Sequence, residues 1–225
     1  MNTRGFFVTG TDTGIGKTYA SCALLMALRA RGLRAVGMKP VASGCVMGVD
    51  GLRNEDAEAL IAASEPAPEY AECNPFAFAE PIAPHIAARI VGREVDMASI
   101  RAAHDRLMAT SDRVVVEGVG GWMAPLSDSL MQADLARALD TPVILVVGLR
   151  LGCLNHALLS ARAIAADGCR LAGWIANRID PAMPYADENL ATLRTRIAAP
   201  LLGVLAHAPG GPAPAAVPAF DVAVL

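Results

Sequence analysis

A glycine-rich segment near the N-terminus carries the residue types that bind phosphate. It reads Gly10-Thr-Asp-Thr-Gly-Ile-Gly-Lys17-Thr18 and separates a short apolar run from a stretch with helical periodicity. In such a loop the backbone amides from Gly14 onward point at phosphate oxygens, the lysine reaches the outer phosphates and the hydroxyl ligates Mg²⁺. Thr11 replaces the first glycine of the usual Gly-x4-Gly-Lys-Ser/Thr pattern. An ordinary helix-capping turn is the alternative, but the strand, Gly-Lys-Thr and helix together favour nucleotide binding.

Lysine is rare in this chain. Of the 19 basic residues only two, Lys17 and Lys39, are lysines. Because arginine carries nearly all the positive charge, a retained lysine indicates a position that needs a compact ammonium group. Lys39 ends a second apolar run, and Glu117 follows three valines at the end of a third. A carboxylate there, beside a phosphate loop, is typical of a magnesium ligand. Taken singly, Lys39 is also explained as a surface charge and Asp56 as a first-turn helix residue.

The elements that must position these residues alternate along the chain between apolar runs and helical stretches. The runs predict strands at 6–9, 35–41, 113–117, 142–147, 171–176 and 201–206, and helices at 17–30, 56–63, 96–109, 132–139, 154–166 and 188–197. Continuously apolar strands between helices predict an α/β fold with a mostly parallel sheet and helices on both faces. Residues 65–84 are expected to be irregular and 118–121 to form a loop. Ligands bind at the carboxyl ends of such strands.

Composition narrows the class of protein. The 225 residues show no repeat or composition break, so we expect a single domain over 1–225, with a flexible Pro/Ala/Gly loop at 208–218. A net charge of −3 argues against nucleic-acid binding. No apolar run approaches the roughly 20 residues of a membrane span, and no signal-peptide pattern opens the chain. The five scattered cysteines lack any Cys-x-x-Cys pair. These features predict a cytoplasmic protein that contacts neither membranes nor nucleic acids.

Taken together, the motifs resemble the dethiobiotin synthetase family, which closes a urea ring at the expense of ATP. The resemblance runs nearly end to end, excluding the tail, through 7–13, 39–44, 51–54, 74–75, 79–81, 84–85, 117–118, 120–122, 125–126, 142–148, 151–153, 155–156, 171–174, 176–177 and 201–203. It implies a P-loop NTPase-like homodimer that takes 7,8-diaminopelargonate, carbon dioxide and ATP with Mg²⁺. A carbamate forms on one amine, ATP converts it to a carbamic-phosphoric anhydride, and the second amine closes the ring with release of ADP and phosphate.

The resemblance also implies roles for particular residues. The catalytic residues would be Lys39, Lys17 and Thr13, and the magnesium ligands Thr18, Asp56 and Glu117. The diamine or its carbamate would contact Ser43, and its distal carboxylate would meet Gly152, Cys153 and Asn155 across the dimer interface. Asn177 would read the adenine amino group. The full set expected to bind nucleotide is Gly14, Ile15, Gly16, Lys17, Thr18, Tyr19, Glu117, Gly118, Gly120, Asn177, Arg178, Ala206, His207 and Ala208.

Departures from the family pattern leave two questions open. Gly14 stands where one branch of the family carries glutamate, so a side-chain contact is missing there. Arg178 replaces an aspartate that can follow the adenine-reading asparagine, and Ala206-His207-Ala208 replaces a proline-containing turn. Strict selectivity for ATP over other nucleoside triphosphates is therefore open.

Two related classes are the alternatives. Switch ATPases of the partitioning and division-site type share the sheet and the unusual loop, but they carry an additional lysine where this chain has Thr11 and Asp12. They also often carry an amphipathic tail or a Cys-x-x-Cys pair, and this sequence has neither. Ligases and amidotransferases of cobalamin synthesis normally add a glutaminase domain, for which 225 residues are too few.

Overall fold

The computed structural model describes residues 4–208 and residue 220. Ten strands and eight helices are assigned within these residues. In chain order they are β1 (Gly5–Gly10), α1 (Lys17–Arg29), β2 (Ala35–Met38), β3 (Val41–Ala42), β4 (Val46–Gly48), β5 (Gly51–Arg53), α2 (Glu55–Ala63), α3 (Tyr70–Cys73), β6 (Phe76–Ala77), α4 (Pro84–Ile90), α5 (Met97–Thr110), β7 (Arg113–Gly121), α6 (Gln132–Ala138), β8 (Val143–Gly148), α7 (Cys153–Ala166), β9 (Leu171–Asn177), α8 (Ala186–Arg196) and β10 (Leu201–Leu205).

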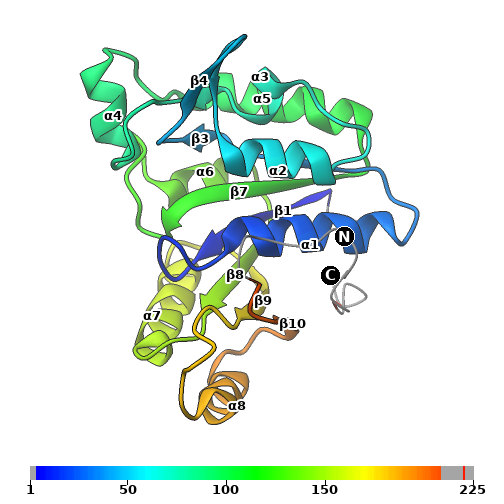
Figure 1. Ribbon diagram of the computed structural model, residues 1–225, viewed down its shortest axis with the longest axis vertical. Helices are drawn as coiled ribbons and strands as arrows, with labels where there is room; N and C mark the ends of the chain where they lie inside the picture. The colour runs from blue at the N-terminus through cyan, green and yellow to red at the C-terminus, as the bar shows by residue number, and fades with distance from the viewer. Residues whose placement is uncertain (1–3, 209–219, 221–225) are drawn as a thin grey trace.

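A six-stranded sheet forms the centre of the molecule, in the order β10-β9-β8-β1-β7-β2. Every neighbouring pair in it is parallel. Figure 1 shows α1 and α2 in front of this sheet, with α5 and α6 behind it. All residues of β1 and β8 are buried, as expected for strands covered on both faces. The predicted α/β fold, a parallel sheet between two layers of helices, is confirmed.

Two apolar cores fix the sheet between its helices. One core joins the sheet to α1 and α2 through side chains such as Leu24 and Leu60. The other joins it to α5, α6, α7 and α8 through Ile100, Ile164 and Leu193. Because both faces are packed, the carboxyl ends of the strands are the edge of the sheet that is free to present loops to a ligand.

The structure corrects several boundaries. The strand expected at 35–41 stops at Met38, because proline at position 40 has no amide hydrogen for the ladder, and Val41–Ala42 pairs with β6 instead. Residues 118–121 are not a loop: β7 continues to Gly121, which pairs with Gly10 of β1. The stretch 65–84 contains α3 and β6 and is therefore less irregular than expected. The expected loop at 208–218 lies, apart from Ala208, outside the described residues.

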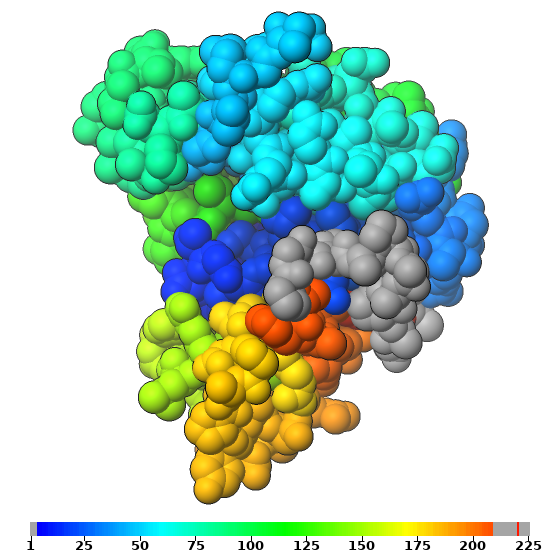
Figure 2. Space-filling model, in the orientation of Figure 1, coloured from blue at the N-terminus to red at the C-terminus, as the bar shows by residue number. Residues whose placement is uncertain are grey.

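Two short elements had no recognisable sequence pattern. Helix α4 has seven residues, and the antiparallel β4–β5 hairpin has three residues in each strand. The hairpin stands out from the surface at the top of Figure 2, and its residues Val46, Met47 and Val49 are exposed. Among the described residues, no helix is both long and apolar enough to cross a membrane.

Candidate functional site

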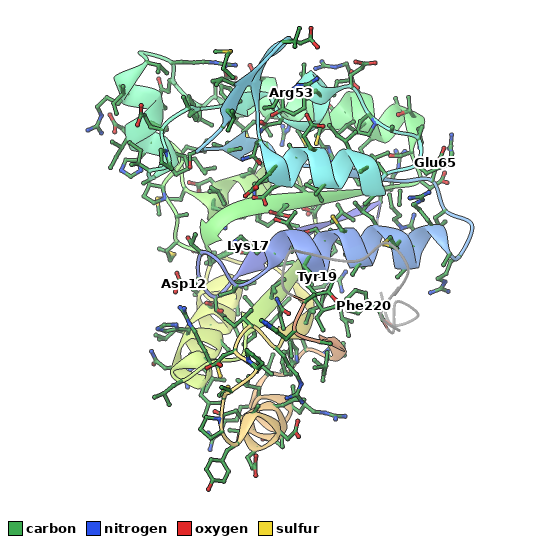
Figure 3. All side chains as sticks on the ribbon, in the orientation of Figure 1. Asp12, Lys17, Tyr19, Arg53, Glu65 and Phe220 are labelled. Carbon is green, nitrogen blue, oxygen red and sulfur yellow. The ribbon has the colours of Figure 1, made fainter. Side chains whose placement is uncertain are left out.

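The phosphate loop connects the carboxyl end of β1 to the first residue of α1. Two glycines give it its shape: Gly14 and Gly16 have φ of 71° and 81°, values that favour glycine. A Cβ atom on Gly16 would also lie 2.2 Å from Nδ2 of Asn177, so no larger residue fits there. Lys17 begins α1 and is 6% exposed; its Nζ donates a hydrogen bond of 2.9 Å to the carbonyl oxygen of Asp12. Figure 3 shows both residues at this turn.

Beside the loop, four polar side chains from four elements meet in one cluster. Nζ of Lys39, which follows β2, lies 2.5 Å from Oε1 of Glu117 and 3.0 Å from Oδ2 of Asp56. The Thr18 hydroxyl lies 2.8 Å from Oδ1 of Asp56 and 2.9 Å from Oε1 of Glu117. Lys39 is 3% exposed and Glu117 is fully buried. The three residues expected to hold magnesium therefore converge on the lysine expected to hold the carbamate.

Burial and mutual charge set the protonation of this cluster. Burial, followed by the charge of Lys39, lowers the pKa of Lys17 from 10.5 to about 8. Burial also acts to lower the pKa of Lys39, but the carboxylates of Glu117 and Asp56 outweigh it and raise that pKa above its ordinary value. Burial acts to raise the pKa of Asp56, and the ammonium of Lys39 with the hydroxyl of Thr18 outweighs it, so this pKa is lowered. The cluster is an ion pair with Lys39 charged.

The donor set fits Mg²⁺. Two carboxylates and a hydroxyl are hard oxygen ligands, and Mg²⁺ usually takes one or two protein carboxylates and completes its shell with phosphate and water. Oε2 of Glu117 is buried and has no hydrogen-bond partner among the described residues. An orphaned buried carboxylate oxygen is costly unless an ion or water satisfies it. No group of three or more His, Cys, Asp or Glu residues suited to a metal occurs in the described part of the chain.

A partly buried chain of hydrogen bonds fixes the backbone on either side of the cluster. The backbone amide of Asn54, which caps α2 next to Asp56, donates to the Tyr70 hydroxyl at 2.8 Å, and that hydroxyl donates to Oδ1 of Asn74 at 3.0 Å. Nδ2 of Asn74 then donates to the carbonyl oxygen of Lys39 at 2.6 Å. Sequence reasoning assigned no role to Tyr70 or Asn74. Tyr70 begins α3 and Asn74 follows it, and a helix of four residues is too short for the sequence pattern to reveal.

Gln132, at the start of α6, is a second residue that the sequence did not single out. It is fully buried, and its Oε1 accepts a hydrogen bond of 2.6 Å from the amide of Val119. Its Nε2 donates to Oγ1 of Thr9 at 3.0 Å and to the carbonyl oxygen of Gly121 at 2.9 Å. The Gln132 side chain therefore connects the carboxyl end of β1 to the end of β7, the strand that carries Glu117. No local signal marks it, because its partners are 11 residues or more away in the chain.

The far end of the site is built by β9 and the residues that follow β10. The Asn177 side chain is buried, and its Nδ2 donates to the carbonyl oxygen of Ile15 in the phosphate loop at 2.8 Å. Arg178 forms an ion pair with Asp187, and its carbonyl oxygen lies 3.2 Å from Nδ1 of His207. This hydrogen bond ties the end of β9 to the phosphate loop and leaves the side-chain oxygen of Asn177 as an acceptor.

A cavity of about 820 Å³ connects these parts. Most of the predicted site residues line it: Thr13, Gly14, Gly16, Lys17, Thr18, Tyr19, Lys39, Ser43, Asp56, Glu117, Gly120, Asn177, Arg178, His207 and Ala208. Ile15, Gly118 and Ala206 lie beside them in the chain without lining the cavity, and the carbonyl oxygen of Gly118 accepts from Nζ of Lys39 at 3.4 Å.

The structure does not bring the segment from Gly152 to Asn155 into this cavity. These residues form the start of α7, where Gly152 has φ of 95° and Asn155 is exposed. Within one chain they therefore stand apart from Lys39 and Ser43. A substrate contact by this segment stays a prediction that depends on a second subunit.

Known proteins share this architecture. A family profile described as "AAA domain" matches residues 4–211. Among solved structures, the MinC:MinD cell division protein complex of Aquifex aeolicus has a TM-score of 0.56 at 14% identity and covers 92% of this chain and 82% of that one. The septum site-determining protein MinD of Pyrococcus horikoshii, complexed with Mg-ADP, has the same TM-score at 17% identity, with coverage of 92% and 82%. At these identities the likeness concerns the fold alone.

Sequence relatives are far closer. The ATP-dependent dethiobiotin synthetase BioD of Xanthomonas euvesicatoria is 59% identical over 215 residues, 96% of this chain and 96% of the relative. The protein of the same name from Xylella fastidiosa strain 9a5c is also 59% identical, over 96% of this chain and 95% of the relative. Identity of this extent over almost the whole of both chains, together with the cluster around Lys39, establishes the relationship. The chain belongs to the dethiobiotin synthetase family.

Proposed function

We propose that this chain catalyses the ATP-dependent carboxylation and ring closure of 7,8-diaminopelargonate with carbon dioxide, which yields dethiobiotin, ADP and phosphate. The observation that carries the proposal is the meeting of both lysines, two carboxylates and the phosphate loop around one cavity. A carbamate and a triphosphate are both anionic, so bringing them together requires cations held in a site that excludes water. Lys17 and Lys39, both almost fully buried, meet that requirement.

The reaction balances without a nucleophile from the protein. One amine of the substrate adds to carbon dioxide and gives a carbamate, and a carbamate oxygen takes the γ-phosphoryl group while ADP leaves. The second amine then attacks the carbamate carbon, the carbon–oxygen bond breaks, and phosphate departs with that oxygen. Positioning supplies much of the acceleration, because the ring closure is intramolecular.

Each residue of the cluster has a proposed part in this reaction. Lys39 holds the carbamate beside the γ-phosphate, and Lys17 neutralises charge on the phosphoryl group in transfer. Thr18, Asp56 and Glu117 hold Mg²⁺, which supplies charge neutralisation on the triphosphate when bound. The other proposed contacts are made by residues that line the cavity.

Around the cavity, Thr13 and Ser43 contact the carbamate side, Asn177 accepts from the base, and Arg178 and His207 border it. The glycines of the phosphate loop present backbone amides to phosphate. The side-chain oxygen of Asn177 is a hydrogen-bond acceptor, so it suits any base that carries an exocyclic amino group.

The proposed assembly is a cytoplasmic homodimer in which the start of α7 binds the distal carboxylate of the substrate held by the other subunit. Backbone amides at a helix N-terminus suit a carboxylate. Two large apolar side chains follow the strand ends on this side of the molecule and are well exposed, Met123 at 61% and Leu151 at 96%. A second subunit would cover them.

Isotope labelling tests the proposed chemistry. The purified chain is supplied with 7,8-diaminopelargonate, MgATP and freshly prepared ¹⁸O-labelled carbon dioxide, and product and phosphate are analysed by mass spectrometry. We expect dethiobiotin equimolar with ADP, and phosphate that contains ¹⁸O from the labelled carbon dioxide. Phosphate that takes its new oxygen from water, or ATP hydrolysis that ignores the diamine and is stimulated by DNA or a partner protein, would instead indicate a switch ATPase.

A further inference from the structure

Lys39 contacts one oxygen of each of the two carboxylates that are assigned to the metal ion. Its Nζ is the cationic partner of Oε1 of Glu117 at 2.5 Å and of Oδ2 of Asp56 at 3.0 Å. The Thr18 hydroxyl lies within hydrogen-bond distance of both of these carboxylates. Lys17, although close, donates instead to the carbonyl oxygen of Asp12. The ammonium group of Lys39 therefore bridges the two carboxylates assigned to Mg²⁺.

We infer that Lys39 is a tethered counter-ion that competes with the divalent cation for Asp56 and Glu117, so that metal binding releases its ammonium group for the substrate. The inference rests on the proposed function for the assignment of the metal to this site. Lys39 would then have two roles. Before the metal binds, its ammonium group neutralises the buried carboxylates, and after the metal binds, the same group is free to bind the carbamate.

Charge and burial explain why such a counter-ion is needed. Glu117 is fully buried, and a buried carboxylate without a cation is strongly unfavourable. Lys39 supplies that cation from a position that is itself 3% exposed. The lysine ammonium is a compact point charge on a flexible stem, which allows it to leave when a stronger cation takes its place. An arginine fork would bind the carboxylate pair in a bidentate and less easily displaced geometry.

Displacement follows from the geometry of the ligands. Mg²⁺ takes carboxylate oxygens at about 2.0–2.1 Å in a strict octahedron. A metal held by these two carboxylates would stand close to the ammonium group of Lys39, and the two cations would repel each other. Lys39 and the metal would therefore compete for Asp56 and Glu117.

Only the side chain of Lys39 has to move. Its backbone is fixed on both sides, because its amide donates to the carbonyl oxygen of Cys73 at 2.8 Å and its own carbonyl oxygen accepts from Asn74 at 2.6 Å. The ammonium group already contacts the carbonyl oxygen of Gly118 at 3.4 Å, a neutral acceptor that the metal does not claim. Movement of the side chain alone therefore suffices for Lys39 to release the two carboxylates.

Metal affinity without nucleotide tests the competition directly. Binding of Mn²⁺ to the free protein is measured by electron paramagnetic resonance for wild type, K39M, K39R and R150M. Arg150 pairs with Asp12 outside the carboxylate cluster, so R150M is matched for loss of one positive charge. We expect K39M to bind Mn²⁺ about tenfold more tightly or better, K39R to bind no more tightly than wild type, and R150M to stay within about twofold of it. A K39M affinity equal to that of R150M would overturn the inference.

A second experiment uses the wild-type protein, in which the charge of Lys39 is retained. Because the chain has only two lysines, protein labelled with ¹³Cε-lysine gives two side-chain signals, assigned with K17R. Titration with Mg²⁺ alone is expected to shift the Lys39 signal and to leave that of Lys17 nearly unchanged. If Mg²⁺ saturates the site while the Lys39 signal stays in place, the inference is wrong. Both experiments omit ATP and the diamine, so their failure is distinct from a failure to make dethiobiotin.

Discussion

At the residue scale, the two lysines have different surroundings although they lie in one cavity. Lys39 contacts two carboxylates, whereas Lys17 contacts a backbone carbonyl oxygen. The pKa of Lys39 is therefore raised, and that of Lys17 falls to about 8. The planar guanidinium of an arginine would present its donors in a wider fork than either ammonium group.

Replacement by arginine tests that difference in shape. We expect K17R and K39R each to lower kcat by about two orders of magnitude or more, although charge is kept, because a fork cannot match the lysine geometry at the transferring phosphoryl group. Steady-state formation of dethiobiotin measures the effect, with thermal unfolding as the control for folding. Rates near wild type would contradict the requirement for lysine.

The lowered pKa of Lys17 predicts a pH dependence. Its folded pKa is about 8 against an ordinary value of 10.5, so between these values the unfolded chain binds the additional proton and this group's contribution makes stability rise with pH. Nucleotide phosphates favour the charged form, so ATP affinity should fall as pH rises above about 8, by at most about tenfold per unit. Equilibrium binding from about pH 7 to pH 9.5 measures it, with K17M as the comparison. A K17M profile as steep as that of wild type would assign the titration elsewhere.

Sequence reasoning was most successful where a residue's role depends on its own local motif. Gly16, Lys17 and Thr18 are adjacent to one another, and their loop geometry follows from glycine and from the start of a helix. Glu117 could be placed because the three valines before it mark a buried strand, although that strand runs on to Gly121. Gln132 could not be predicted, because its partners belong to β1 and β7 and only the packed fold brings them near α6.

At the scale of elements, β7 is the strand on which the site depends most. It carries Glu117 and then runs on to Gly121, where the expected loop proved to be paired strand. Gln132 holds this extension from the side through Val119 and Gly121. A Cβ atom on Gly118 would lie 2.3 Å from Oε1 of Gln132, so the strand and the side chain fit without space between them. The pattern of residues along the sequence does not reveal packing of this kind.

Removing the polar end of Gln132 tests its part in holding β7. We expect Q132L to be destabilised by about 1–3 kcal/mol, because the amide of Val119 and the carbonyl oxygen of Gly121 lose their partner. T9V, which removes only the contact with Thr9, is the matched control and should cost less. Chemical denaturation measures both variants. Equal stability of Q132L and wild type would show that these hydrogen bonds do not stabilise the strand end.

The helices and strands that the sequence predicted differ in length and context from those that it did not predict. Helices such as α1 and α7 are long enough for their periodicity to be read, and each was expected within a residue or two of its actual ends. The β4–β5 hairpin and α4 are too short to show a period, and their form depends on the tertiary fold. The break after Met38 has a local cause, Pro40, whose effect on the ladder could have been anticipated.

At the scale of the whole molecule, one chain does not assemble every residue assigned to the substrate. The cavity gathers most of the residues proposed to bind nucleotide and carbamate, while the start of α7 stands outside it. Leu151, just before that helix, is 96% exposed. An apolar side chain so exposed beside a predicted carboxylate site is expected to be covered in the functional assembly.

A charge at this position tests the proposed dimer. We expect wild type to run as a dimer in light scattering after size exclusion, and L151E to dissociate at about tenfold higher protein concentration, because a carboxylate is costly in an apolar interface. V49E, on the exposed β4–β5 hairpin, is the control and should leave the mass unchanged. A wild-type monomer, or an L151E dimer as stable as wild type, would contradict the assembly.

The central claim is that two ammonium groups and a divalent ion together neutralise the charge between the γ-phosphate and the carbamate. A crystal structure with the diamine, Mg²⁺ and a non-hydrolysable ATP analogue tests it most directly. The account predicts Nζ of Lys17 and of Lys39 each within about 3 Å of a phosphate or substrate oxygen, with the metal on Thr18, Asp56 and Glu117. Either ammonium group pointing into bulk solvent, away from both anions, would contradict it.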